Sequence, residues 1–232
     1  MVKLEDLDFG APAAERDIDH GLIDYFIQSP AFSRVASRER TIVLGNRGTG
    51  KSAIFKVLAS EQKRERALVI ELSPEDFSYE ILNAALASEN RGAWVKHAAF
   101  ASAWKYLIWV LVMKEVTAHG RSHKKGAAAR VYNYLRDNHQ NISDNPISIL
   151  VSYLKRMEGF KIGSYEAGIK TRELTKLYKL EEIQNLLPDL QEILGSTKVF
   201  VFVDELDRGW DASEDAKAFV AGLFQASVSI NE

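Results

Sequence analysis

The sequence of 232 residues predicts an α/β fold with a parallel sheet and a large helical insertion. Three short apolar runs, at residues 41–44, 68–72 and 199–203, have the composition of buried strands, and a helix start follows each of them. Residues 80–195 follow helical spacing for most of their length. Strands that alternate with helices are typical of a parallel sheet covered by helices.

The composition is that of a globular protein without disulfides. Hydrophobic residues make up 46% and charged residues 27% of the chain, which excludes global disorder. There is no cysteine, so a disulfide scaffold and a thiolate metal site are excluded. The first residues lack the apolar segment of a secretory signal, and we therefore expect a cytoplasmic protein.

The charge is unevenly distributed along the chain. Residues 91–179 hold 16 Lys and Arg against 6 Asp and Glu, a balance of +10, whereas the remainder has a balance of −12. Two interpretations stay open. The basic segment is either a set of solvated helix faces, or a surface for nucleic acid or an acidic partner protein.

The elements that precede the insertion follow from local signals. Four apolar residues at helical spacing predict a first helix that ends at Pro30, namely Leu22, Ile23, Phe26 and Ile27. The run Thr41–Leu44 predicts a buried strand that ends at Gly45, and residues 52–63 predict the helix after it. Residues 68–72 predict the second strand.

The insertion contains one strongly apolar helix. Its apolar residues cover nearly the whole circumference around Trp104 and Tyr106, so we expect deep burial. The alternative is a membrane span. The continuous apolar run lies between Lys105 and Lys114, far short of the roughly 20 residues that a span requires, and we expect no membrane span.

A glycine-rich segment follows the first predicted strand and opens a helix. It fits the pattern G-x-x-x-x-G-K-[ST] and consists of Gly45, Asn46, Arg47, Gly48, Thr49, Gly50, Lys51 and Ser52, followed by Ala53. Glycines let successive backbone N–H groups curl around a polyanion, and a helix N-terminus adds partial positive charge. The alternative is a tight turn that binds nothing.

The side chains of this segment suit a bound nucleotide triphosphate. Lys51 supplies an ammonium for the β- and γ-phosphates, and the Ser52 hydroxyl is a ligand for Mg²⁺. No Asn-Lys-x-Asp pattern for reading guanine is present, so ATP is the expected nucleotide. Phe9 and Gly10 are candidates to lie near the base, with simple N-terminal packing as the alternative.

Two carboxylates follow the third predicted strand. Ligands of open α/β sheets bind at the carboxyl ends of the strands. We expect Asp204 to hold Mg²⁺ and Glu205 to activate the attacking water, with a solvated acidic turn as the alternative. Arg208 is a candidate to reach the γ-phosphate or a neighbouring subunit, or to pair with Asp207.

These motifs resemble those of bacterial AAA+/STAND-like ATPases, in the ASCE division of P-loop NTPases. The resemblance rests on residues 8–10, 45–52 and 203–211 (Val-Asp-Glu-Leu-Asp-Arg-Gly-Trp-Asp), and KAP-type NTPases are similar around residues 205–208. It implies a three-layer P-loop core, with residues 1–80 and 196–232 as its parts and 81–195 as the basic helical insertion. The group is often linked to anti-phage defence.

One feature departs from that group. Its members place a further strand with a polar sensor residue after the acidic strand, and no such strand follows residues 199–203 here. We therefore expect a core that is incomplete at the C-terminus. His119 and His123 lie four residues apart, but the absence of a neighbouring acid and the presence of Gly120 favour a solvated loop over a zinc site.

Three functions are compatible with the sequence. The first is an ATPase that hydrolyses ATP to ADP and phosphate and so drives a conformational or assembly switch, as a homo-oligomer or with a partner protein. The second is a nucleotide-dependent binding module with little turnover. The third is a phosphotransferase, against which Glu205 argues because a second carboxylate suits hydrolysis.

Overall fold

The computed structural model describes residues 21–73, 96–118, 125–139, 145–159, 176, 179–206 and 210–231. The described part is mixed α/β, mostly helical, with a small parallel sheet of two strands, which is consistent with a partial P-loop fold. The chain forms two compact units. The core unit comprises Met1–Glu71 and Lys198–Asp204, and the helical unit comprises Leu72–Thr197 and Glu205–Glu232.

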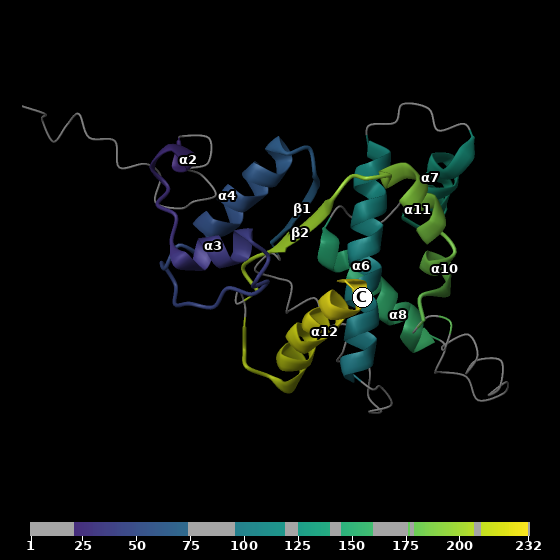
Figure 1. Ribbon diagram of the computed structural model, residues 1–232. Helices are drawn as coiled ribbons and strands as arrows, with labels where there is room; N and C mark the ends of the chain where they lie inside the picture. Colours follow the sequence, from purple (N-terminus) through teal and green to yellow (C-terminus); the bar gives the residue numbers. More distant parts are fainter. Residues whose placement is uncertain are drawn as a thin grey trace, which may run out of the picture. The chain divides into compact units, whose positions relative to one another are not determined.

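In its described residues the core unit contains three helices and the paired strands (Figure 1). Its elements are α2 (Leu22–Tyr25), α3 (Pro30–Ala36), α4 (Lys51–Arg64), β1 (Leu68–Leu72) and β2 (Val199–Val203). Both strands lie at the residues that the sequence predicts. The two strands are neighbours in one sheet although more than a hundred residues separate them in the sequence.

Apolar side chains of α2, α3 and α4 form the centre of the core unit. The buried members of this cluster are Leu22, Phe32, Ile54, Val57 and Leu58. Phe202 of β2 packs against them, and its ring lies 5.7 Å from that of Phe55 in an edge-to-face arrangement. Helix α4 is thereby fixed against the sheet.

The structure corrects the predicted role of Pro30. This residue begins α3 instead of ending the helix before it, and α2 stops at Tyr25. Ser29 is the N-cap, because its hydroxyl accepts a hydrogen bond of 3.2 Å from the Phe32 amide. Proline suits the first helical position since its missing N–H would have no helical partner there.

The predicted strand at residues 41–44 is wrong. The structure places no strand there, and the side chains of Ile42 and Leu44 are 52% and 88% exposed. Val43, between them, packs against the apolar cluster of the core unit. A strand needs a hydrogen-bonded neighbour, and in the described part of the chain β1 and β2 pair only with each other.

The helical unit is arranged around one long helix, α6 (Lys96–Ala118) (Figure 1). Helices α7 (Gly126–His139), α8 (Pro146–Gly159), α11 (Leu187–Leu194) and α12 (Glu214–Asn231) all contact α6. The short helix α10 (Glu181–Gln184) contacts α11.

The predicted burial of α6 is confirmed. Phe100, Trp104 and Leu107 have no exposed surface, and Tyr106 is 1% exposed. The Trp104 indole N–H donates a hydrogen bond of 3.0 Å to the carbonyl oxygen of Phe219 in α12. Among the described helices, none has the length and apolar character that a membrane crossing requires.

Helix α12 packs closely on α6 at Gly222. The N-cap of α12 is Ser213, whose hydroxyl accepts a hydrogen bond of 3.0 Å from the Ala216 amide. A Cβ atom added at Gly222 would lie 2.6 Å from Cβ of Phe100 and 3.0 Å from the amide nitrogen of Ala101. Only glycine lets the two helix backbones approach this far.

Replacing Gly222 by Ala is expected to lower the free energy of unfolding. Alanine favours helix by about 1 kcal/mol, but the overlap with the α6 backbone costs about 1–3 kcal/mol and outweighs that gain. Urea denaturation of Gly222→Ala and of the exposed control Gln225→Ala measures the effect. An unchanged or raised stability of Gly222→Ala would show that the helices separate at no cost.

Candidate nucleotide-binding site

The loop of residues 45–50 leads directly into the first turn of α4. Gly48 and Gly50 have φ angles of +82° and +83°, which residues with a side chain rarely adopt. A Cβ at Gly45 would lie 2.7 Å from the Thr49 hydroxyl oxygen. The backbone path therefore requires glycine at Gly48 and Gly50, whereas a side chain in place of Gly45 would need the Thr49 side chain to move. Residues 45–50 are exposed to solvent.

The ammonium of Lys51 closes this loop. Lys51 Nζ donates hydrogen bonds of 2.9 Å to the carbonyl oxygens of Gly45 and Asn46. The Thr49 hydroxyl also donates to the Asn46 carbonyl, at 2.8 Å. The cation thus lies within the curl of the backbone, where an incoming phosphate would exchange these two carbonyls for its own oxygens.

The first N–H groups of α4 point out of the helix beside the same loop. The amide of Ile54 already bonds to the Gly50 carbonyl, at 3.0 Å. The backbone amides of Lys51, Ser52 and Ala53 come before that of Ile54 and have no acceptor within the helix. Together with the helix dipole, these donors suit an anion, and the Ser52 hydroxyl begins the same turn.

Helix α4 is held to both strands. Phe55 contacts Phe202 of β2, and two lysines of α4 hold one carboxylate of β1. Lys56 and Lys63 each lie 2.6 Å from a carboxylate oxygen of Glu71. Burial alone would raise the pKa of Glu71, but the hydrogen bonds from both lysines lower it below 4.5.

The pairing of Glu71 with Lys56 and Lys63 was not predicted from the sequence. The available signal was the spacing of Lys56 and Lys63, seven residues apart and so on one face of α4, together with the single acid within β1. The two ion pairs join α4 to β1.

Asp204 belongs to the same unit as Lys51 and Ser52. Phe202, two residues before Asp204, touches Phe55, which lies one turn after Lys51. This contact ties the strand that precedes Asp204 to the first turns of α4.

Glu205 has an unusual backbone conformation. Its φ angle is +58°, in the left-handed region that a glutamate rarely occupies. Such backbone strain is concentrated at functional sites, where the surrounding structure enforces it. Glu205 is the first residue of the helical unit after Asp204, and both side chains are half-buried.

Several predicted residues lie outside the described part of the chain. They are Phe9, Gly10, His119, His123, Asp207 and Arg208. Among the described residues, no group of three or more His, Asp or Glu side chains is arranged to hold a metal ion.

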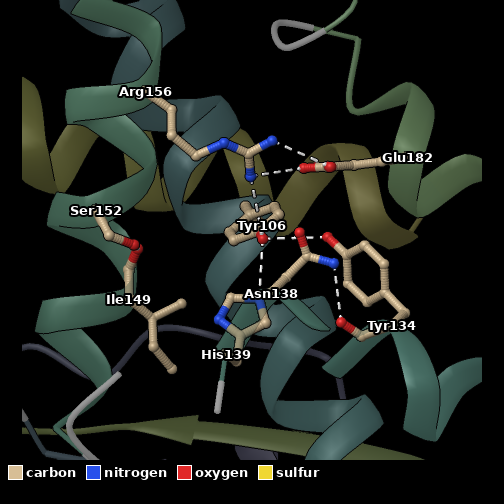
Figure 2. Close-up of polar contacts among 8 residues, drawn as sticks. All are labelled: Tyr106, Tyr134, Asn138, His139, Ile149, Ser152, Arg156 and Glu182. Carbon is tan, nitrogen blue, oxygen red and sulfur yellow. Dashed lines mark hydrogen bonds and ion pairs between the residues drawn. The ribbon is translucent and has the colours of Figure 1, made fainter. Parts of the chain in front are cut away.

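A polar cluster lies within the helical unit, and sequence analysis missed it as well. Figure 2 shows Tyr106 at its centre, between Tyr134, His139 and Arg156. The Tyr106 hydroxyl lies 2.9 Å from His139 Nε2 and 3.1 Å from the Tyr134 hydroxyl. The cluster joins α6, α7 and α8. A contact among three helices depends on how they pack, so no local sequence pattern predicts it.

Burial shifts the titration of this cluster. It raises the pKa of Tyr106 to about 12 and also raises that of Tyr134. It lowers the pKa of His139 from 6.5 to about 4, with a smaller contribution from the positive charges of Lys114 and Arg156. His139 Nδ1 is buried and has no hydrogen-bond partner among the described residues. The folded protein therefore favours neutral His139.

Acid is expected to destabilise the protein through His139. The unfolded histidine titrates near 6.5 and the folded one near 4, so stability is lost as pH falls through this window. The loss between pH 7.5 and 5 is about 2 kcal/mol. Urea denaturation of the wild type and of His139→Gln at both pH values isolates this contribution, since the variant should lack it. Equal losses in both proteins would contradict it.

Comparison with known proteins gives two matches. A family model described as ORC-CDC6-like matches residues 9–79, which include the loop, α4 and β1. The chain is also similar to an 80.3 kDa protein of Escherichia coli (strain K12) that is named after transposon gamma-delta. The two are 25% identical over 226 residues, which cover 97% of this chain and 32% of that protein.

The chain thus spans about a third of the length of this curated relative. No solved structure matches the chain. The family match contains the whole glycine-rich loop. It ends before strand β2 and the two carboxylates that follow it. It points to an AAA+ ATPase-type family and to a nucleotide-binding role for the core unit.

Proposed function

We propose that the chain binds Mg-ATP at residues 45–53 and hydrolyses it to ADP and phosphate. The Lys51 ammonium and the amides of the loop hold the phosphates, and Ser52 and Asp204 hold Mg²⁺. Glu205 activates the attacking water. The change at the γ-phosphate then drives a conformational or assembly switch, in a homo-oligomer or with a partner protein.

The observation that carries this proposal is the position of Lys51 Nζ, 2.9 Å from two carbonyl oxygens inside the loop. Holding a flexible, exposed lysine side chain in one conformation costs conformational entropy. We therefore take this position to mean that the loop is shaped to hold a positive charge. The positive φ angles of Gly48 and Gly50 keep that backbone curled before any ligand arrives. A curled, solvent-exposed loop that holds one ammonium beside the start of a helix is suited to a polyphosphate.

A second candidate function is a nucleotide-dependent binding module whose basic segment, residues 91–179, contacts nucleic acid. Two observations favour it: the balance of +10 charges in that segment, and the similarity to a protein named after a transposon. Contacts to phosphates release counterions, so such binding would weaken steeply as salt rises. The link to anti-phage defence and the cytoplasmic location stay predictions of the sequence.

Replacing Glu205 by Gln is expected to separate the two candidates. The amide keeps the shape of the side chain but accepts no proton, so phosphate release should fall by about a hundredfold or more while ATP binding is retained. Steady-state phosphate release and equilibrium ATP binding are measured on the same preparations. Glu65→Gln, at the exposed end of α4, is the matched control and should keep both activities.

The outcomes decide between the functions. Wild-type turnover that is lost in Glu205→Gln supports hydrolysis, and turnover that survives the substitution contradicts the role of Glu205. ATP binding without turnover in either protein supports the binding module.

A further inference from the structure

Four basic residues of the core unit lie around the starts of its two strands. The Leu68 amide of β1 donates a hydrogen bond of 2.8 Å to the carbonyl oxygen of Lys198, which directly precedes β2. Arg66 lies two residues before Leu68, and Arg64 is the last residue of α4. Arg38, which follows α3, is the fourth. All four residues are exposed, and we call them the core basic surface.

Arg38 is joined to this surface by a contact with β2. Its guanidinium lies over the ring of Phe200, 5.0 Å from the ring centroid. Side chains two residues apart along a strand lie on one face of the sheet, as the nearly parallel rings of Phe200 and Phe202 show. Lys198 is two residues before Phe200 and already bonds to β1, so the same alternation assigns it to that face. A guanidinium that stacks on an aromatic ring keeps its N–H edge for a second partner.

Two of these arginines have a backbone conformation that usually belongs to glycine. Arg38 and Arg66 both have a φ angle of +62°, in the left-handed region. Each directly follows the C-cap of a helix, namely Ser37 of α3 and Glu65 of α4. Glycine is favoured there because it has no Cβ. The helix dipole favours a cation near either helix end, but an arginine one residue earlier would supply it without the strain. The two positions therefore indicate a further role for these side chains.

The charge of the core basic surface is not neutralised within the described part of the chain. No ion pair there joins any of the four cations to a carboxylate, whereas Lys56 and Lys63 of α4 both pair with Glu71. The adjacent acids Glu39 and Glu65 are exposed, and the cations outnumber them two to one. An excess of positive charge on an exposed surface attracts polyanions.

The residue types and their distribution favour a polymer of phosphates as the polyanion. Three of the four cations are arginines, whose planar fork of N–H groups matches two oxygens of a phosphate. They come from separate segments of the chain, so the positive charge is spread over a surface instead of gathered at one point. A polymer with a phosphate at every residue would contact several of these cations at once.

We infer that the core basic surface binds the phosphodiester backbone of a nucleic acid, independently of base sequence. The inference goes beyond both functions proposed above, which place a nucleotide at residues 45–53 and nucleic acid at residues 91–179. All four cations belong to the core unit, so the contact depends neither on ATP nor on the helical unit. Failure of the ATPase proposal would leave it intact.

Fluorescence anisotropy of a labelled DNA duplex, without nucleotide, tests this surface. In Arg66→Gly, DNA affinity at about 0.1 M salt should fall about three- to tenfold, and the slope of log affinity against log salt should shrink by about one, because each phosphate contact releases about 0.9 counterion. Glycine suits the left-handed backbone, so the Tm of Arg66→Gly should not fall. Arg66→Lys keeps the charge and should retain most of the affinity. An RNA duplex of equal length, measured in parallel, shows which polymer binds more tightly.

Arg136→Gln and Lys155→Gln are the matched controls. Both residues are exposed and lie within residues 91–179, and Arg136 pairs with its neighbour Asp137. Each variant removes the same charge as Arg66→Gly, so the net charge of the protein changes equally. DNA affinity should stay within about twofold of the wild type, because salt screens the effect of a distant charge.

Several results would overturn the inference. They are the absence of binding of either duplex by the wild type at low salt, unchanged affinity and slope in Arg66→Gly, and equal weakening in Arg66→Gly and both controls. Weakening in the controls alone would also contradict it and would support the second function proposed above. Polyglutamate that competes as strongly as DNA would indicate an acidic protein partner instead. If Arg66→Gly does not fold, Lys198→Gln replaces it with the same expected changes in affinity and slope.

Discussion

Replacing Lys51 by Ala is expected to weaken ATP binding by about ten- to a hundredfold. The ammonium lies inside the loop, within hydrogen-bond distance of two of its carbonyls. A hydrogen bond to a charged group contributes about 1.5–3 kcal/mol, and about 1.4 kcal/mol corresponds to a factor of ten in affinity. Titration of each variant with ATP and Mg²⁺ by calorimetry measures the change.

Lys63→Ala is the matched control for this experiment. Lys63 lies on the same helix and pairs with Glu71, so its loss removes an equal charge without touching the loop. Its ATP affinity should stay within about twofold of the wild type, because a surface ion pair contributes little. Equal affinities for Lys51→Ala and the wild type would mean that the phosphates bind elsewhere.

Replacing Trp104 by Ala is expected to give the largest loss of stability, about 3–5 kcal/mol. The indole is fully buried, its ring centroid lies 4.8 Å from that of Phe219, and its N–H holds the Phe219 carbonyl. The substitution leaves a cavity between α6 and α12 and an acceptor without its donor. Thermal denaturation should show a Tm lower by about 10 °C.

The control for this prediction is Trp109→Ala. Trp109 lies on the same helix but is only partly buried, so its removal should cost clearly less. A similar loss for both variants would show that helix α6 as a whole, and not the contact with α12, determines the stability.

The sequence predicted the elements whose signals are local. The glycine-rich loop, helix α4 and strand β2 were each identified, because the loop pattern and the run Val199–Val203 lie within a few neighbouring residues. The deep burial of most of α6 followed from apolar residues around nearly its whole circumference. These features need no knowledge of the partner segment.

The errors concern features that depend on distant partners. Residues 41–44 have the composition of a strand, but pairing decides whether a strand forms, and the described part of the chain places no neighbour beside them. The predicted helix end at Pro30 is wrong because proline also suits a helix start, and the Ser29 cap shows that α3 begins there. The cluster around Tyr106 depends on how three helices pack, which no local spacing encodes.

Only part of the candidate site could be predicted from the sequence. The residues that we propose to surround a phosphate lie in one continuous loop, so the sequence pattern identifies them. The two carboxylates follow β2, whose place beside α4 depends on long-range packing through Phe55 and Phe202. The ion pairs of Lys56 and Lys63 with Glu71 join a helix to a strand, and such a contact between two elements depends on how they pack.

The central claim is that residues 45–53 bind the phosphates of ATP. Backbone amide NMR spectra recorded as Mg-ATP is added test this claim most directly. The amide resonances of Gly48 to Ala53 are predicted to shift most, because their N–H groups exchange solvent for phosphate oxygens. A folded protein in which those resonances stay in place, while ATP shifts others or none, would contradict the account.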